Sequence, residues 1–273
     1  MEPQIQNLSV LIIGYDPYFD IWPYFDYFFK KNFSECHIPS FFITCSRCPV
    51  TSSGYSSIKT DGDMKVTSRL KCGLSSVNTD YVLVLLDDYI ISKQINVVLL
   101  GSIVDEMKKR DFDYCELCNF IAKPKMQKER NGHGTINTLK RNQKYLISLQ
   151  PAIWKKDFLL SICDNDLVRP WDMEVYLDHC FSFEGERQSL PKAGAVLGTL
   201  SICNFVDKGE ITRDALKLIQ RVGLPYPSRD VEKRIVALKK RIINFASSFT
   251  PRPIRRFFKK VGKLFGAHFF TDN

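Results

Sequence analysis

Short apolar runs alternate with amphipathic segments along the first part of the chain. Continuous runs at 8–15, 38–45 and 81–86 are typical of strands that are buried on both faces. Between them, apolar residues recur every three or four positions, which predicts a helix over 18–33 and a second helix near 64–77. Strands that alternate with helices favour a parallel sheet with helices on its faces.

The alternation continues into the second half. We expect a helix at about 93–110, a strand at 112–120, renewed order at 146–154 and a helix that starts near Pro170, a residue suited to the first helical turn. Together these elements predict an α/β fold with a mostly parallel sheet flanked by helices.

Two polar stretches interrupt this pattern. Residues 46–63 contain Gly and Ser, and residues 122–145 lack an apolar period. Both are predicted to be loops, and the second is predicted to be mobile.

Two adjacent carboxylates follow the apolar run at 81–86. Asp87 and Asp88 would lie at the carboxyl end of a central strand, where open α/β sheets bind ligands. Two neighbouring negative charges there are costly unless something positive binds beside them. The alternative is a turn or helix cap that keeps two solvated acids.

The composition is that of a folded protein, with 44% hydrophobic and 25% charged residues in a chain of 273. The apolar stretch near the amino terminus has no basic region before it, so a secretory signal is not expected. The longest uncharged run, residues 193–206, is shorter than the roughly 20 residues that span a bilayer. A cytoplasmic protein is therefore expected.

Nine cysteines include two Cys-x-x-Cys pairs, Cys45/Cys48 and Cys115/Cys118, which raise the alternative of a zinc site. The pairs are 66 residues apart, however, and a strand at 112–120 would point Cys115 and Cys118 to opposite faces. In a reducing compartment, structural thiols are the favoured interpretation.

The positive charge of the chain is concentrated near its end. Residues 229–263 contain twelve Lys or Arg and two acids, a balance of +10 against +9 for the whole chain. Apolar residues recur there at helical spacing, from Val231 and Ile235 to Phe265, with basic residues between them. We therefore expect a catalytic domain over 1–228 and a basic amphipathic helical tail over 229–273.

Such a tail is typical of a helix that lies on an anionic membrane surface. The alternative is that its apolar stripes pack on the domain and its charges face water. Nucleic acid is not the expected partner, because no recognisable nucleic-acid-binding module is visible.

Four stretches of the chain carry a family resemblance: LIIGYDPYFDIWPYFDYFFKKNF, TDGDMKVTSRLKCGLSSVNTDYVLVLLDDYIIS, SLQPAIWKKDFLLSICDNDLVRPWDMEVY and NFVDKGEI. In these stretches the chain resembles the bacterial GT-A glycosyltransferases of surface polysaccharide synthesis. The resemblance covers roughly residues 8–224 as a pattern. It implies transfer of a sugar from a nucleotide-sugar donor to a polysaccharide or lipid-linked acceptor such as those of capsule or O-antigen.

In the family, an Asp-x-Asp element ends the central strand, and its last carboxylate holds Mg or Mn on the donor diphosphate. By this resemblance, Asp88 is the metal ligand and Asp87 the middle position, while Leu86 replaces the first Asp. This assignment agrees with the chemistry of hard cations, which often bind through one or two protein carboxylates together with substrate phosphates. Strict Asp-x-Asp matches elsewhere, at Asp61/Asp63, Asp111/Asp113 and Asp164/Asp166, do not follow a buried strand.

The resemblance also implies the other site residues. Inverting enzymes of this fold place a catalytic base early in a helix in this part of the chain, which favours Glu174 over Asp172. Acids in a first helical turn otherwise complement the helix dipole. Donor contacts are expected at Tyr15 and Asp16 for the nucleoside, at Asp61, and at Arg69 for phosphate.

The sequence therefore leads to a glycosyltransferase, inverting and assisted by a divalent metal, on the cytoplasmic face of the cell membrane. The second hypothesis is a noncatalytic membrane-surface binding protein with a GT-A-like fold, which the missing first Asp favours. The sugar, the nucleotide and the acceptor are not specified by the sequence.

Overall fold

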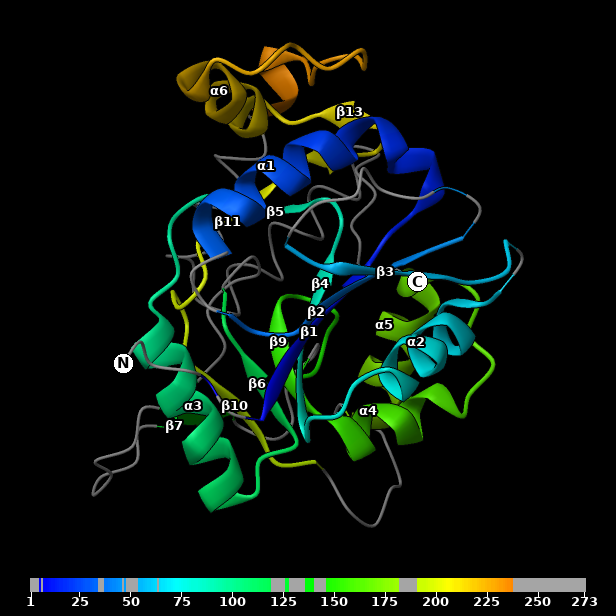
Figure 1. Cartoon of the computed structure of the whole chain (residues 1–273), viewed down its shortest axis with the longest axis vertical. Helices are drawn as coiled ribbons and strands as arrows, with labels where there is room; N and C mark the ends of the chain where they lie inside the picture. Colours follow the sequence, from blue (N-terminus) through cyan, green and yellow to red (C-terminus); the bar gives the residue numbers. More distant parts are fainter. Residues whose placement is uncertain are drawn as a thin grey trace, which may run out of the picture.

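The computed structural model describes residues 5, 7–33, 37–45, 47, 54–62, 64–118, 126–127, 136–139, 146–181 and 191–237. The predicted mobile loop at 122–145 and the basic tail lie largely outside these ranges. The predicted α/β class is confirmed, because a mixed sheet runs through the molecule with helices on both faces (Figure 1).

The main sheet has nine strands within the described ranges, in the order β3-β2-β1-β4-β9-β6-β10-β8-β7. They are β1 (Leu8–Ile13), β2 (Ser40–Thr44), β3 (Ser56–Lys59), β4 (Tyr81–Leu86), β6 (Tyr114–Glu116), β7 (Met126–Gln127), β8 (Asn137–Leu139), β9 (Ala152–Lys155) and β10 (Ala193–Ala195). β1 to β4 are mutually parallel where they pair, and β10 is parallel to β6. β9 runs antiparallel between β4 and β6, so the sheet is more mixed than the sequence predicted.

Two small ladders accompany the main sheet. β5 (Tyr89–Ile91) pairs with β11 (Ile202–Asn204), and β12 (Val206–Asp207) pairs with β13 (Glu210–Ile211). Both bring the chain after residue 200 back to the end of β4, where Phe205 N donates to the Asp88 carbonyl at 2.8 Å.

Two helix layers cover the sheet because its central strands are apolar on both faces. One layer holds α1 (Trp22–Phe33) and α3 (Val97–Arg110), with α6 (Arg213–Val222) beside α1 (Figure 1). The other layer holds α2 (Val66–Ser75), α4 (Lys156–Cys163) and α5 (Pro170–Phe181). Along β1, Leu8, Val10 and Ile12 face the first layer, whereas Leu11 and Ile13 face the second.

The predicted helices and buried strands lie close to their expected bounds. Ile21, Tyr24, Phe25 and Phe28 are buried as their spacing indicated, and a 3-10 helix, η1 (Asp16–Ile21), leads into α1. Three expectations were wrong. The predicted loops at 46–63 and 122–145 contain strand β3 and strands β7 and β8, and the strand predicted over 112–120 spans only Tyr114–Glu116.

The chain beyond the expected domain boundary at 228 continues in contact with the domain. Ile211 N donates to the Asp230 carbonyl at 2.8 Å, and Glu232 N donates to the Ile211 carbonyl at 2.9 Å. Glu232 is buried. No helix in the described ranges is both long and apolar enough to cross a bilayer.

Candidate functional site

The carboxyl ends of β1, β2 and β4 gather five of the expected site residues. Parallel strands end at the same edge of a sheet, so the loops after them meet there. Asp87 and Asp88 follow β4, Tyr15 and Asp16 follow β1, and Arg69 reaches this edge from α2.

Asp87 joins the end of β4 to the segment that follows β1. Its side chain is buried, and its Oδ2 accepts hydrogen bonds from Tyr15 N at 2.7 Å and from Trp22 Nε1 at 2.6 Å. Burial raises the pKa of Asp87 to about 7, against the opposing effect of these two donors. The main contacts of Asp87 are therefore with the protein, and they fix the position of the neighbouring loop.

Asp88 points into a different environment. Its Oδ1 is enclosed, yet it has no hydrogen-bond partner among the described residues. Burial, with a smaller contribution from the nearby carboxylate of Asp207, raises the pKa of Asp88 to about 7, although a hydrogen bond from its own backbone opposes the shift. An enclosed acceptor without a donor, close to a second carboxylate, is an environment that a cation would stabilise.

The loop after β1 presents an aromatic ring outward on a fixed backbone. Gly14 is required there, because a Cβ atom would lie 2.4 Å from the Phe42 ring and 2.8 Å from the Ile43 carbonyl oxygen. The Tyr15 side chain is 53% exposed, and its ring meets that of Tyr18 edge-on at 5.1 Å. About half of Tyr15 is therefore accessible from solvent.

Asp16 has a structural part in the same loop. Its carboxylate accepts from Cys45 N at 3.0 Å and from Arg47 N at 2.9 Å, which ties the end of β1 to the end of β2. A ligand could contact the Asp16 carboxylate only where these two hydrogen bonds do not already occupy it.

Arg69 is buried beneath this edge of the sheet. One of its terminal nitrogens donates to the carbonyl oxygens of Gly14 and, at 3.5 Å, of Ile43. Its Nε is enclosed without a partner among the described residues. The positive charge of Arg69 is therefore met in part by main-chain carbonyl dipoles.

Glu174 and Asp172 occupy different environments although both lie in the first turns of α5. Burial raises the pKa of Glu174, whose carboxylate is held by the main-chain amide of Leu149. Asp172 accepts from Arg169 N, and its two oxygens take Arg169 Nη2 at 2.9 Å and Nε at 3.1 Å. This ion pair lowers the pKa of Asp172.

Tyr89 links Glu174 to the Asp88 region. Burial raises the pKa of Tyr89, and the charges of Asp88 and Glu174 raise it further. The three side chains are thus electrostatic neighbours at one edge of the sheet. A raised pKa suits a carboxylate for accepting a proton, so the site favours Glu174 over Asp172 as a base.

Asp61 is not brought into this cluster. It is exposed, and its carbonyl oxygen accepts from Met64 N in a turn. Other Asp-x-Asp aspartates form surface ion pairs, Asp111 with Lys155 at 2.6 Å and Asp164 with Lys71 at 2.9 Å. These aspartates therefore do not join the carboxylates that follow β4.

Sequence reasoning missed Asp207, whose carboxylate is near Asp88, and a second acid, Glu116, at the end of another strand of the sheet. Glu116 ends β6, and burial raises its pKa to about 7. Asp207 lies on β12. Glu116 closes a strand that is only three residues long, and Asp207 stands in the NFVDKGEI stretch without having been assigned a role.

The residues present are compatible with one divalent cation, provided that a ligand supplies part of its coordination. No group of three or more His, Cys, Asp or Glu side chains within the described ranges is arranged to hold a metal alone. Asp88 Oδ1 offers one free oxygen, and Asn204 Oδ1, on the strand paired with Tyr89, is a second enclosed acceptor without a donor. Mg²⁺ commonly binds through one or two carboxylates and substrate phosphates.

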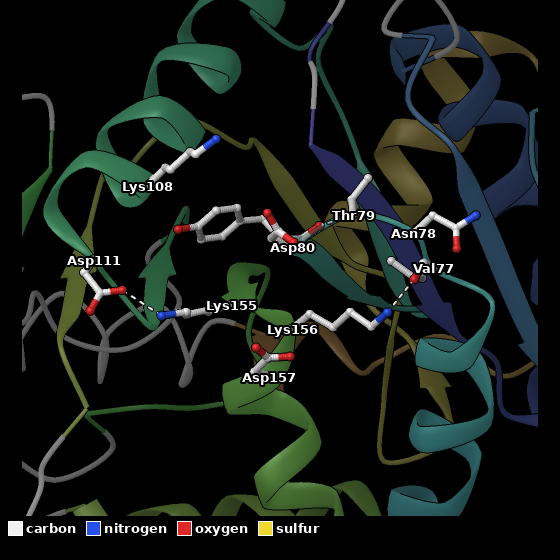
Figure 2. A pocket seen from close by; sticks show the side chains of 10 residues that line it. Val77, Asn78, Thr79, Asp80, Lys108, Asp111, Lys155, Lys156 and Asp157 are labelled. Atoms are coloured by element: carbon white, nitrogen blue, oxygen red, sulfur yellow. Dashed lines mark hydrogen bonds and ion pairs between the residues drawn. The ribbon is translucent and has the colours of Figure 1, made fainter.

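A separate pocket of about 520 Å³ lies at the opposite edge of the sheet. Figure 2 shows its lining, with Lys155 paired to Asp111 and Lys156 directed at the Val77 carbonyl. It lies at the start of β4, whereas Asp87 and Asp88 follow the end of that strand. Its ammonium groups are matched by Asp80, Asp111 and Asp157, so the pocket has no excess charge to attract an ion.

No protein-family model and no curated protein matches the chain. One similar solved structure is 2-C-methyl-D-erythritol 4-phosphate cytidylyltransferase from Thermus thermophilus, with 9% identity over 80% of this chain and 100% of that chain, and a TM-score of 0.44. The bifunctional IspDF from Campylobacter jejuni aligns with 13% identity over 73% of this chain and 52% of that chain, with a TM-score of 0.39.

S. aureus TarS 1-349 aligns with 11% identity over 70% of this chain and 58% of that chain, with a TM-score of 0.41. The chain thus spans about half of IspDF and less than two thirds of TarS 1-349. Likenesses of this strength assign neither a family nor an activity to the chain.

Proposed function

We propose that the protein is a glycosyltransferase that moves a sugar from a nucleotide-sugar donor to a saccharide or lipid-linked acceptor, with help from Mg or Mn. The observation that carries this proposal is the enclosed, partnerless Oδ1 of Asp88 at the carboxyl end of β4, within the part of the chain that the structure describes. Around it lie an exposed tyrosine, a buried arginine and a carboxylate with a raised pKa.

The donor occupies the edge formed by β1, β2 and β4. The exposed side chain of Tyr15 stacks on the nucleobase, since base–aromatic stacking contributes about 1–3 kcal/mol. Arg69 would attract the diphosphate from beneath, and Asp88 would hold the cation, which would neutralise part of the phosphate charge. Asp87 keeps Tyr15 in place through its hydrogen bond to Tyr15 N.

Transfer needs a group that accepts the proton of the attacking hydroxyl. Glu174 takes this role, because its partly buried carboxylate has a raised pKa and is oriented by the amide of Leu149. The bound cation supplies neutralisation of the charge that develops on the leaving diphosphate. Direct attack from the side opposite the leaving group inverts the anomeric configuration.

We also propose that the tail places the domain on the inner face of the cell membrane, near a lipid-linked acceptor. The predicted apolar stripe of the tail begins at Val231 and Ile235. Val231 packs against the core of the domain, whereas Ile235 is 62% exposed, so the exposed part of this stripe begins at Ile235. An apolar stripe left uncovered and flanked by Lys233 and Arg234 suits an anionic lipid surface.

Product analysis tests the reaction. The full chain is incubated with MnCl₂ and UDP-, GDP-, TDP- or CMP-sugars, and release of the free nucleotide is measured. The proposal predicts release with one donor class, its loss in Asp88→Ala, and strong reduction in Glu174→Gln. Release of pyrophosphate from CTP or UTP with a sugar phosphate, and no release from nucleotide sugars, would instead indicate a nucleotidyltransferase.

Flotation with vesicles tests the membrane proposal. We expect the full chain to float with vesicles of anionic phospholipid and not with vesicles of phosphatidylcholine alone. A variant truncated after residue 237 should stay in the dense fraction with both. Equal flotation of the truncated and full chains would contradict the assignment to the tail.

A further inference from the structure

We infer that Arg229 is a positioning residue for the candidate nucleotide site, acting through η1, the 3-10 helix that follows Tyr15. The inference rests on the proposed function and adds a residue that the sequence assigned to the tail. It makes the returning C-terminal segment, residues 225–232, part of the site.

Arg229 contacts three residues of η1. Its Nε and Nη2 each lie 2.6 Å from an oxygen of Asp20, a two-pronged ion pair. Nη2 also donates to the Pro17 carbonyl oxygen. The guanidinium lies over the Tyr18 ring, 4.9 Å from its centroid. A planar fork that matches a carboxylate while stacking on a ring is specific to arginine.

The contacts continue from η1 to the ligand-facing residues. Tyr18 packs edge-on against Tyr15, and Tyr15 N is bound to Asp87. The charges of Asp88 and Asp87 add to the effect of burial in raising the pKa of Tyr18, and Arg229 opposes them, so the phenol of Tyr18 lies within electrostatic reach of both the acids and the arginine. Arg229 therefore sets the position of the aromatic pair against which a nucleobase would lie.

The segment that carries Arg229 is itself fixed on both sides. Tyr24 on α1 donates to the Pro225 carbonyl oxygen at 3.0 Å, and Asp230 and Glu232 are hydrogen-bonded to Ile211. The side chain of Arg229 is 20% exposed. A partly buried, preorganised arginine loses little further freedom when a ligand binds, which suits a positioning role.

The test compares nucleotide affinities of the full chain by calorimetry with Mg present. The probes are the nucleoside diphosphate that binds the wild type, among UDP, GDP and TDP, and the matching monophosphate. The variants are Arg229→Gln and Arg229→Lys, with Arg221→Gln as the control, because Arg221 is exposed in the last turn of α6. Circular dichroism establishes the temperature at which every variant is folded.

We expect Arg229→Gln to raise the Kd about tenfold, within the usual range for coupled sites, and to raise it equally for the diphosphate and the monophosphate. An equal loss of affinity for both nucleotides is expected if Arg229 affects the binding of the nucleobase, which the two ligands share. Arg229→Lys should recover only part of the affinity, because an ammonium cannot form the fork. Arg221→Gln should bind as the wild type does. If Arg229→Gln does not fold, Arg229→Lys and Asp20→Asn carry the same comparison.

Wild-type affinity in the Arg229 variants would overturn the inference and leave the proposed function standing. A loss confined to the diphosphate would also overturn it, because Arg229 would then act on phosphate. A wild type that binds none of the nucleotides would reject the proposed function, and this inference with it.

Discussion

Trp22 Nε1 donates a 2.6 Å hydrogen bond to Asp87 Oδ2, which joins the first residue of α1 to the end of β4. The same oxygen accepts from Tyr15 N, so one buried carboxylate organises two loops at the candidate site. The adjacent Asp88 has an oxygen without a donor among the described residues. The two neighbouring aspartates thus differ in their contacts, and we propose that Asp87 fixes the protein structure whereas Asp88 binds a ligand.

Removing Asp87 should therefore cost more stability than removing Asp88. Asp87→Ala leaves the indole N–H of Trp22 and the amide of Tyr15 without an acceptor in a buried place, which lowers the free energy of unfolding by roughly 2–4 kcal/mol. Asp88→Ala removes a buried carboxylate whose Oδ1 has no donor in the described ranges, and it should be neutral or stabilising. Urea denaturation of both variants checks this, and equal destabilisation would contradict the difference in role.

Stability should depend on pH through Asp88. Its pKa is about 7 in the folded protein and near 3.8 unfolded, so the folded state binds more protons between these values. The free energy of unfolding should fall as the pH rises from about 4 to about 7. Asp88→Asn should reduce this fall, by roughly 2–4 kcal/mol, and leave the part due to Asp87.

Urea midpoints at pH 5 and pH 8 measure the effect. Asp61→Asn is the matched control, because Asp61 is exposed. The same pH dependence in the wild type and Asp88→Asn would show that Asp88 is solvated and ionised, and it would remove the electrostatic reason for a cation there.

Substitutions of Glu174 and of Asp172 should have different effects on turnover. Glu174→Gln keeps the shape of the side chain and removes the proton acceptor, so turnover should fall about 10²- to 10⁴-fold while donor affinity is retained. Asp172→Asn should lower turnover little, because Asp172 is engaged with Arg169. Measurement of kcat and donor Kd for both variants decides, and the reverse order would move the base to Asp172.

Arg69 should affect the phosphate end of the ligand. Arg69→Lys keeps a positive charge but loses the fork, so diphosphate affinity should fall about tenfold and monophosphate affinity less. Calorimetry with both ligands tests this. Equal losses would mean that Arg69 serves the fold through Gly14 and Ile43 alone.

The sequence predicted the central elements because burial dictates their patterns. β1 and β4 are apolar on both faces, and α1 places Phe25 and Phe28 in the core at helical spacing. β3 was missed because it is an edge strand whose Ser56 and Ser57 are exposed, so it has no apolar alternation. The antiparallel direction of β9 was also missed, because side chains alternate in the same way in either direction.

The candidate site was predictable only where it follows a strong strand. Asp87 and Asp88 stand directly after β4, which the apolar run marks. Glu116 is the last residue of a strand of only three residues, and Arg229 lies more than 200 residues from its partner Asp20. The count of charged residues placed Arg229 in the basic tail. Such a count does not show that the guanidinium of Arg229 forms an ion pair with Asp20 of the domain.

The most direct test is the thermal stability of the wild type and Asp88→Ala with UDP, GDP, TDP or CMP, each with and without MnCl₂. A nucleotide at 100 times its Kd should stabilise the fold by about 2.7 kcal/mol. The proposed function predicts a manganese-dependent shift with one nucleotide that is lost in Asp88→Ala. No shift with any nucleotide, or the same shift in the variant, would contradict it.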